Sequence, residues 1–259
     1  MAKKETMGRT FAVIGGLCLV CSIVVSVAAV GLKPIQQRNQ VLDVQSNIVS
    51  VAGFDASSAR AVEESYARFI EARLVDLDTG EFSDLPVEGY NQRNAAKDPN
   101  ASIRLSSDED PAGIRRRANL APVYLAKDEN GELDSIILPV HGQGLWSTMY
   151  AFVAVAPDGN TIKGITYYEQ GETPGLGGEI ENPNWRAQFV GKHLFDGNGQ
   201  PALRVVKGGA PEGSEHGVDG LSGATLTSNG VQHTFEFWMG PKGFGPFLAK
   251  IREGELNNG

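Results

Sequence analysis

Hydrophobic side chains are concentrated near the start of the sequence, where the 22 residues from Phe11 to Leu32 include no charged side chain. At about 1.5 Å per residue, a helix of this length spans about 33 Å, which matches the hydrocarbon core of a bilayer. We therefore predict an N-terminal segment, residues 1–10, and one transmembrane helix, residues 11–32. Small residues would let a helix of another protein approach closely: Gly15, Gly16, Ser22, Ser26, Ala28 and Ala29.

A cleaved signal peptide is the alternative, because Val27-Ala28-Ala29 resembles a small-residue cleavage site. The apolar run is longer than the roughly 7–15 residues of a usual signal-peptide core, which favours a retained anchor. A slight positive-inside bias predicts a cytoplasmic N-terminus and a body on the outer side of the membrane. The basic residues concerned are Lys3, Lys4 and Arg9 before the run, and Lys33 and Arg38 after it.

The segment after the anchor, residues 33–120, is predicted to be a helical and loop-rich linker and insertion. Residues 35–51 have the pattern of a helical continuation or linker, and residues 57–74 that of an amphipathic helix. Residues 76–119 are rich in Asp, Asn, Pro and Arg, so we expect loops there, with Arg115, Arg116 and Arg117 on a solvated face. The apolar face of the predicted helix consists of Val62, Tyr66, Phe69, Ile70 and Leu74.

Strand patterns dominate from Pro122 onward. Residues 123–126 and 133–138 flank a turn at 128–131, and residues 149–156 and 161–168 flank a second turn at 157–160, so each pair predicts a hairpin. A glycine-rich loop at 172–178 precedes a short helix near 183–190, for which Asn182 is the candidate N-cap. A strand at 203–207 and helices at 225–239 and about 245–252 follow. We predict an α+β domain of antiparallel hairpins with flanking helices over residues 121–259, and not a doubly wound sheet.

The net charge of the chain limits the kinds of molecule it can bind. The whole chain has a formal net charge of −8 and residues 1–33 contribute +3, so the remainder carries −11. An acidic body repels phosphodiester backbones, which argues against nucleic-acid binding.

Neither the cysteines nor the histidines predict a metal site in the body. Both cysteines, Cys18 and Cys21, lie in the apolar run and share one helix face; packing in lipid is the favoured interpretation, and a redox or metal role across an oligomer interface is the alternative. The histidines lack metal-ligand spacing: His141, His193, His216 and His233.

The segment at residues 217–228 carries the most specific chemistry. Ser222, Gly223 and Ala224 are small, so their backbone N–H groups can approach a ligand closely, and they precede a predicted helix. The start of a helix offers unpaired N–H donors and a positive dipole end, which favour a phosphate. The hydroxyl of Thr225 would lie within such a site. An ordinary helix N-cap, worth about 1 kcal/mol, accounts for the same residues equally well.

A family resemblance favours the phosphate site. Residues 219–225, DGLSGAT, resemble the flavinylation motif of the FMN-binding domain family, an Asp followed by a Ser/Thr-Gly-Ala-Thr core. The resemblance implies that a separate flavin transferase, with FAD as donor, esterifies Thr225 to the phosphate of FMN. Asp219 then either fixes the loop or serves the transferase reaction. The cofactor residues implied in this segment are Asp219, Ser222, Gly223, Ala224, Thr225 and Thr227.

A second segment, residues 172–178, ETPGLGG, resembles the ETPGLG loop that lies along the flavin in the same family. Alone it is a weak signal, because Pro-Gly also favours a surface turn, and it does not match GxGxxG. The resemblance implies that Thr173 and backbone amides bond the flavin ring and that Leu176 packs on its face. Glu172 and Gly177 belong to the same implied site.

Two further residues are candidates for the cofactor site. Trp146 follows the flexible segment at 142–144 and could stack on a flavin ring, although core packing before a strand is nearly as good an explanation. Lys207 could offset the charge of a phosphate, or could simply be solvated.

The single anchor, the long body and the C-terminal SGAT motif together resemble the family of C subunits of the Na+-translocating NADH:quinone oxidoreductase. This implies a membrane-bound carrier that relays electrons from NADH toward ubiquinone, with other membrane subunits as partners. The sequence has no dinucleotide fingerprint, so NADH should be oxidised elsewhere in the complex. The related G subunit of the Rnf complex is an alternative, but it is shorter between about 35 and 120. A non-redox periplasmic binding or assembly module is the alternative of a different class.

Overall fold

The computed structural model describes residues 7–255, in two units that meet between Val44 and Gln45. Helix α1, Met7–Val51, is 45 residues long, and its residues up to Val44 form the described part of the first unit. Its most apolar window has a mean hydropathy of 2.7 and none of it is buried, so the helix is long and apolar enough to cross a membrane. The predicted continuation over 35–51 is helical. Lys3 and Lys4, which enter the prediction of orientation, lie outside the described residues.

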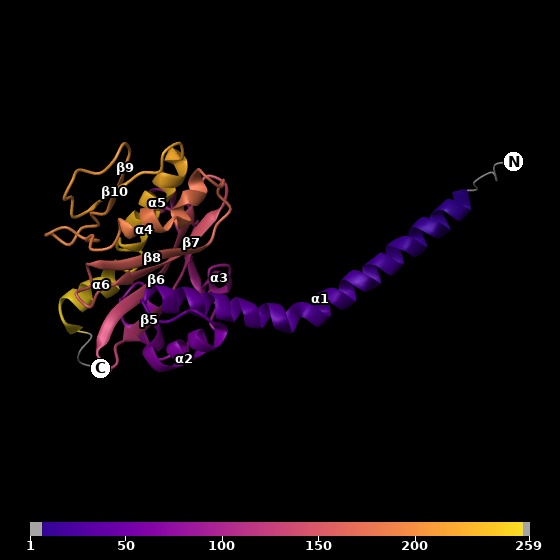
Figure 1. The fold of residues 1–259 in the computed structure, drawn as a ribbon, viewed down its shortest axis with the longest axis horizontal. Helices are drawn as coiled ribbons and strands as arrows, with labels where there is room; N and C mark the ends of the chain where they lie inside the picture. Colours follow the sequence, from indigo (N-terminus) through magenta and orange to yellow (C-terminus); the bar gives the residue numbers. More distant parts are fainter. Residues whose placement is uncertain (1–6, 256–259) are drawn as a thin grey trace. The chain divides into compact units, whose positions relative to one another are not determined.

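The second unit is built on a six-stranded antiparallel sheet of order β2-β1-β5-β6-β7-β8 (Figure 1). The predicted hairpins are confirmed as β5-β6 and β7-β8. An antiparallel sheet with helices is the predicted α+β class. The strands are β1 Ile70–Asp76, β2 Phe82–Ser83, β5 Leu120–Lys127, β6 Leu133–Gln143, β7 Thr148–Val155 and β8 Ile162–Glu169.

Side chains alternate along each strand and so point to both faces of the sheet. Helices cover both of these faces. On one face, Val123 and Ile136 belong to a core with Val231 and Leu248 of the C-terminal helices. On the other face, the end of α1 is close to β8, since a Cβ added at Gly164 would lie 3.4 Å from Cγ2 of Val51. Figure 1 shows the sheet between these two groups of helices.

The remaining elements are short. Asn182 is the N-cap of α4, as predicted, because its Oδ1 accepts a hydrogen bond from Asn184 N–H at 3.0 Å. The other elements are α2 Ala59–Phe69, α3 Gln92–Ala95, β3 Ser102–Arg104, η1 Ser107–Glu109, β4 Arg116–Ala118, η2 Gly177–Glu181, α4 Pro183–Ala187, β9 Arg204–Val206, β10 Gly217–Asp219, α5 Thr225–Trp238 and α6 Gly245–Arg252. The predicted strand at 203–207 and the two C-terminal helices are confirmed.

Helix α5 is held tightly against β6. A Cβ added at Gly230 would lie 2.5 Å from the carbonyl oxygen of Gln143, so only glycine allows the two backbones to come this close. At the end of the helix, Trp238 Nε1–H donates to the carbonyl oxygen of His141 at 2.7 Å. These contacts fix the helix that begins at Thr225.

The predicted helix over 57–74 is wrong in its last third. Helix α2 ends at Phe69, and β1 begins at Ile70, whose N–H still donates to the carbonyl of Tyr66. Ile70 and Leu74 are four residues apart, which suits a helix face, but with Ala72 they also alternate as a strand requires. Pairing of β1 with β5 decides the outcome in favour of the strand.

The expectation of a solvated face at 115–117 is wrong for Arg117, which is 1% exposed in strand β4. Its Nη2 lies 2.9 Å from Asp78 Oδ1, and its Nη1 donates to the carbonyl oxygen of Lys242 at 3.0 Å. A buried guanidinium is tolerated where partners take up its donors; here both Nη groups are paired, while Nε has no partner among the described residues. Arg117 therefore joins the segment after β1 to the segment after α5.

We expect Arg117→Ala to lower the free energy of unfolding by about 3 kcal/mol, because it leaves a cavity and an unpaired carbonyl group at Lys242. Urea denaturation of the full chain in detergent, followed by tryptophan fluorescence, measures this change. The control is Arg60→Ala, which removes an exposed pair with Glu64 and should cost less than about 0.5 kcal/mol. Equal midpoints for the two variants would contradict the assignment.

Candidate cofactor site

The carboxylate of Glu172 joins three segments that are distant in the sequence. Its Oε1 accepts from the N–H groups of Trp146 at 2.9 Å and Ser147 at 3.1 Å. Its Oε2 accepts from Leu145 N–H at 3.1 Å and from the hydroxyl of Thr227 at 2.6 Å. The turn between β6 and β7, the loop at 172–178 and the first turn of α5 therefore meet at one buried side chain.

The carboxyl of Glu172 has a lowered pKa although the residue is only 5% exposed. Burial acts to raise the pKa of this carboxyl, but the hydrogen bonds from Thr227, Trp146, Leu145 and Ser147 outweigh it and hold the pKa below its usual range. Two carboxylate oxygens offer about four lone-pair directions, and these four donors use them. Glu172 is therefore suited to holding the three segments of the site together.

Glycines allow the three segments to pack this closely. A Cβ added at Gly177 would lie 2.5 Å from Thr227 Oγ1 and 2.9 Å from Glu172 Oε2. A Cβ added at Gly144 would lie 2.6 Å from Glu172 Oε1. Side chains at either position would separate the loops from α5.

We expect Gly177→Ala to lower the free energy of unfolding by about 2 kcal/mol, because the new methyl group displaces the Thr227 hydroxyl from Glu172. The control is Gly197→Ala, where an added Cβ has nothing within 4 Å and the change should stay below about 0.5 kcal/mol. Denaturation midpoints of the two variants give the comparison. A Gly177→Ala midpoint as high as that of the control would show that the loop is not packed as described.

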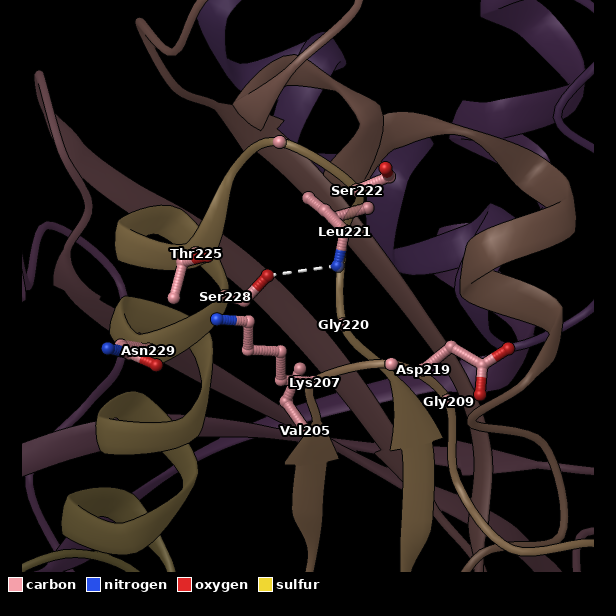
Figure 2. Close-up of a pocket in the computed structure, with 12 residues that line it drawn as sticks. Val205, Lys207, Gly209, Asp219, Gly220, Leu221, Ser222, Thr225, Ser228 and Asn229 are labelled. Atoms are coloured by element: carbon pink, nitrogen blue, oxygen red, sulfur yellow. Dashed lines mark hydrogen bonds between the residues drawn. The ribbon is translucent and has the colours of Figure 1, made fainter.

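The first turn of α5 leaves its donors open. Its N-cap is Ala224, which has no side-chain hydrogen bond, so the alternative of an ordinary hydroxyl N-cap is wrong. Ser228 Oγ instead accepts from Leu221 N–H at 2.9 Å and shapes the preceding loop (Figure 2). Thr225 is exposed, and within residues 7–255 its hydroxyl has no hydrogen-bond partner. The hydroxyl and the first-turn amides are therefore available to a ligand.

A cavity of about 430 Å³ lies beside Thr225. Lys207 lines it and, as Figure 2 shows, extends from the end of β9 toward the first turn of α5. Asp219 also lines the cavity, but its Oδ1 accepts from Ala210 N–H at 2.7 Å and its carboxylate points away from Thr225 (Figure 2). Of the two roles expected for Asp219, this geometry favours fixing the loop.

The three segments that meet at Glu172 carry exposed large apolar side chains: Leu145 and Trp146, Leu176, and Leu226. Trp146 is 69% exposed, so the alternative of core packing is wrong. Leu176 comes from the loop at 172–178, and its Cδ2 would lie 3.2 Å from a Cβ added at Gly223. Thr173 is also exposed, while its carbonyl oxygen accepts from the N–H groups of Leu176 and Gly178 and closes the turn.

This arrangement fits a flavin nucleotide in two respects. The open helix start and Lys207 suit a phosphate, and the exposed apolar side chains suit the faces of fused aromatic rings. Sequence reasoning missed the close approach at Gly144, the loop-shaping bond of Ser228 and the position of Asn229 in the cavity. Asn229 follows Thr225 by four residues, so helical spacing could have found it.

The family model that matches this chain is the FMN-binding domain, over residues 144–240. The match includes the β6–β7 turn, the loop at 172–178 and the start of α5, so the protein is one with an FMN-binding domain. The C subunit of the Na+-translocating NADH-quinone reductase of Vibrio alginolyticus is 64% identical over 99% of both chains, and that of Yersinia pestis is 55% identical over 98% of this chain and 97% of the other. The chain belongs to the family of C subunits of the Na+-translocating NADH-quinone reductase. This confirms the resemblance to these proteins, rather than to the Rnf G subunit.

Solved structures agree. The crystal structure of NqrC from Shewanella oneidensis has a TM-score of 0.76 and 42% identity, and the comparison covers 82% of this chain and 97% of that chain. The C subunit of the same reductase from Parabacteroides distasonis has a TM-score of 0.67 and 30% identity, and the comparison covers 84% of this chain and 96% of that chain.

Proposed function

We propose that this protein carries FMN as a phosphoester on Thr225 and uses it to pass electrons between neighbouring redox centres of the reductase. The observation that carries the proposal is the position of Thr225. Thr225 is the first residue of α5 and is exposed, and it lines the same cavity as Lys207. Leu176, an exposed apolar side chain, lies close to Gly223 in the loop before it. The proposed cofactor residues are Thr225, Ser222, Gly223, Ala224, Asp219, Thr227, Glu172, Thr173, Leu176, Gly177, Trp146 and Lys207.

Attachment follows from the exposed hydroxyl. The oxygen of Thr225 attacks the FMN phosphorus of FAD on a flavin transferase; the new O–P bond forms as the P–O bond to AMP breaks. AMP leaves, and the hydroxyl proton passes to the transferase. No oxidant or reductant is needed. The ester removes dissociation of the cofactor, which suits a carrier on the outer side of a membrane.

The chain's residues then supply position and environment. Bound flavin provides the electron transfer itself. Trp146 and Leu176 would pack against the ring and exclude water from its face, while Glu172 holds their two loops on α5. Na+ translocation belongs to other parts of the complex.

The long apolar helix α1 bears on where the protein is located. We propose that α1 is retained in the cell inner membrane and packs through its small residues on other members of the complex. The charge bias around it favours a body on the periplasmic side. The flavin transferase is a further, transient partner.

Intact-mass spectrometry tests the attachment. The full chain, produced together with a flavin transferase, should be heavier than the unmodified chain by FMN less one water. Fragmentation should place the added mass on a peptide that contains Thr225. An unmodified mass, with flavin released by denaturation, would contradict the proposal.

A further inference from the structure

The cavity beside Thr225 brings together three polar side chains that have no partner among the described residues. Thr225 begins α5, Asn229 lies one turn later on the same side of the helix, and Lys207 follows β9. No hydrogen bond or ion pair of these side chains exists within residues 7–255. In Figure 2 the ammonium group of Lys207 and the amide group of Asn229 both lie beside the first turns of the helix.

The backbone around Lys207 is tied to the same helix. Val205 N–H donates to Oε1 of Gln232 at 2.7 Å, and Nε2 of Gln232 donates to the carbonyl oxygen of Leu203 at 3.0 Å. On the other side, Gly220 N–H donates to the carbonyl oxygen of Val206 at 2.8 Å. Strand β9 is therefore fixed on α5, and Lys207 is held near Thr225 by bonds that do not involve its own side chain.

Two kinds of side chain lie near Thr225. Lys207 and Asn229 offer a cation and an amide donor in the cavity, whereas Leu176 offers an exposed apolar group close to Gly223. Asp219 adds a negative charge to the cavity wall, but its carboxylate is turned toward Ala210. A phosphate suits the cation and the amide, and a flavin ring suits the apolar group.

We propose that Lys207 and Asn229 form a clamp for the phosphate esterified to Thr225, and that this clamp directs the flavin ring toward Leu176 and Trp146. The proposal rests on the proposed function and adds Asn229, which lies outside the flavinylation motif, as a positioning residue. Lys207 neutralises the charge of the phosphodiester, and Asn229 donates a hydrogen bond to it.

The rate of flavin attachment gives the first test, with the full chain in detergent, purified flavin transferase and FAD. We expect Lys207→Met to slow attachment about fivefold, as for the loss of one exposed charge pair. Asn229→Asp keeps the shape but replaces the donor with a charge that repels the phosphate, and should slow attachment about tenfold. The double variant Lys207→Met with Asn229→Lys returns a cation to the cavity and should recover most of the rate. Lys97→Met, at an exposed residue outside the cavity, is the matched control and should attach flavin at the wild-type rate.

The ³¹P NMR shift of the attached phosphodiester gives the second test, because it reports the surroundings of the phosphate itself. We expect this shift to change in Lys207→Met and Asn229→Asp and to stay the same in Lys97→Met. Wild-type rates in the two cavity variants would overturn the clamp. A slower rate with an unchanged ³¹P shift would also overturn it, because Lys207 would then act on the transferase. Failure of the wild-type chain to gain flavin at Thr225 would instead refute the proposed function.

Discussion

Replacement of Thr225 by alanine is expected to abolish covalent flavin while leaving the fold intact. The ester needs a hydroxyl oxygen at this position, and alanine has none. Under ultraviolet light after denaturing electrophoresis, the wild-type band should fluoresce and the Thr225→Ala band should be dark. Thr225→Ser is the matched control: it keeps the oxygen and should give a fluorescent band.

The stability of the Thr225→Ala variant separates loss of attachment from loss of structure. Thr225 is exposed and its hydroxyl bonds no described residue, so the free energy of unfolding of the unmodified chain should change by less than about 0.5 kcal/mol. Urea denaturation of both chains, produced without the transferase, measures it. A bright Thr225→Ala band would place the ester elsewhere, and a dark wild-type band would exclude it.

Replacement of Glu172 by glutamine is expected to lower the free energy of unfolding by about 3 kcal/mol at neutral pH. The substitution keeps the shape but turns one acceptor oxygen into an NH2 group. That group would face either the N–H groups of Trp146 and Ser147 or the donors of Leu145 and Thr227. In either orientation two donors lose their acceptor. Urea denaturation of the full chain in detergent measures the loss, and Glu129→Gln, in an exposed turn, is the control and should change the free energy by less than about 0.5 kcal/mol.

The same carboxylate makes a specific contribution to the pH dependence of stability. The pKa of Glu172 is lowered from its ordinary 4.5 in the folded protein, so protonation favours the unfolded chain. Its contribution is fully present above pH 4.5 and is lost as the pH falls through the folded pKa, below 4.5. The difference in unfolding free energy between wild type and Glu172→Gln should therefore be constant from pH 7 to about 5 and shrink at lower pH. A difference that stays constant to pH 3, or a variant as stable as wild type, would contradict the described hydrogen bonding.

Local signals predicted much of this fold from the sequence. The two hairpins are marked by turn residues between strands of alternating polarity. The starts of α4 and α5 are marked by Asn182 and by the small residues before Thr225, which lie next to these helices in the sequence. The motif ending at Thr225 is also local. Strand β1 was missed because Ile70, Ala72 and Leu74 satisfy two periodicities, and pairing with β5, about 50 residues later in the chain, decides between them.

The organisation of the site could not be predicted, because its contacts are distant in sequence. Glu172 accepts hydrogen bonds from residues 25 to 27 positions before it and from Thr227, 55 positions after it. Arg117 finds partners 39 and 125 positions away, which is why an arginine run that resembles a solvated face includes a buried residue. Sequence pattern predicts Thr225 as the acceptor hydroxyl, whereas tertiary packing determines what surrounds it.

The contacts that hold α5 have a consequence for how a redox group could move if it is tethered at Thr225, as proposed. The helix is held at Thr227 by Glu172, at Gly230 by close contact with the end of β6, and at Trp238 by the carbonyl of His141. These contacts hold the base of the proposed tether on the sheet and on the loop that carries Glu172. If the flavin moves between a donor and an acceptor that lie far apart, the movement would then come from rotation about the single bonds of its ribityl chain, or from displacement of the whole body.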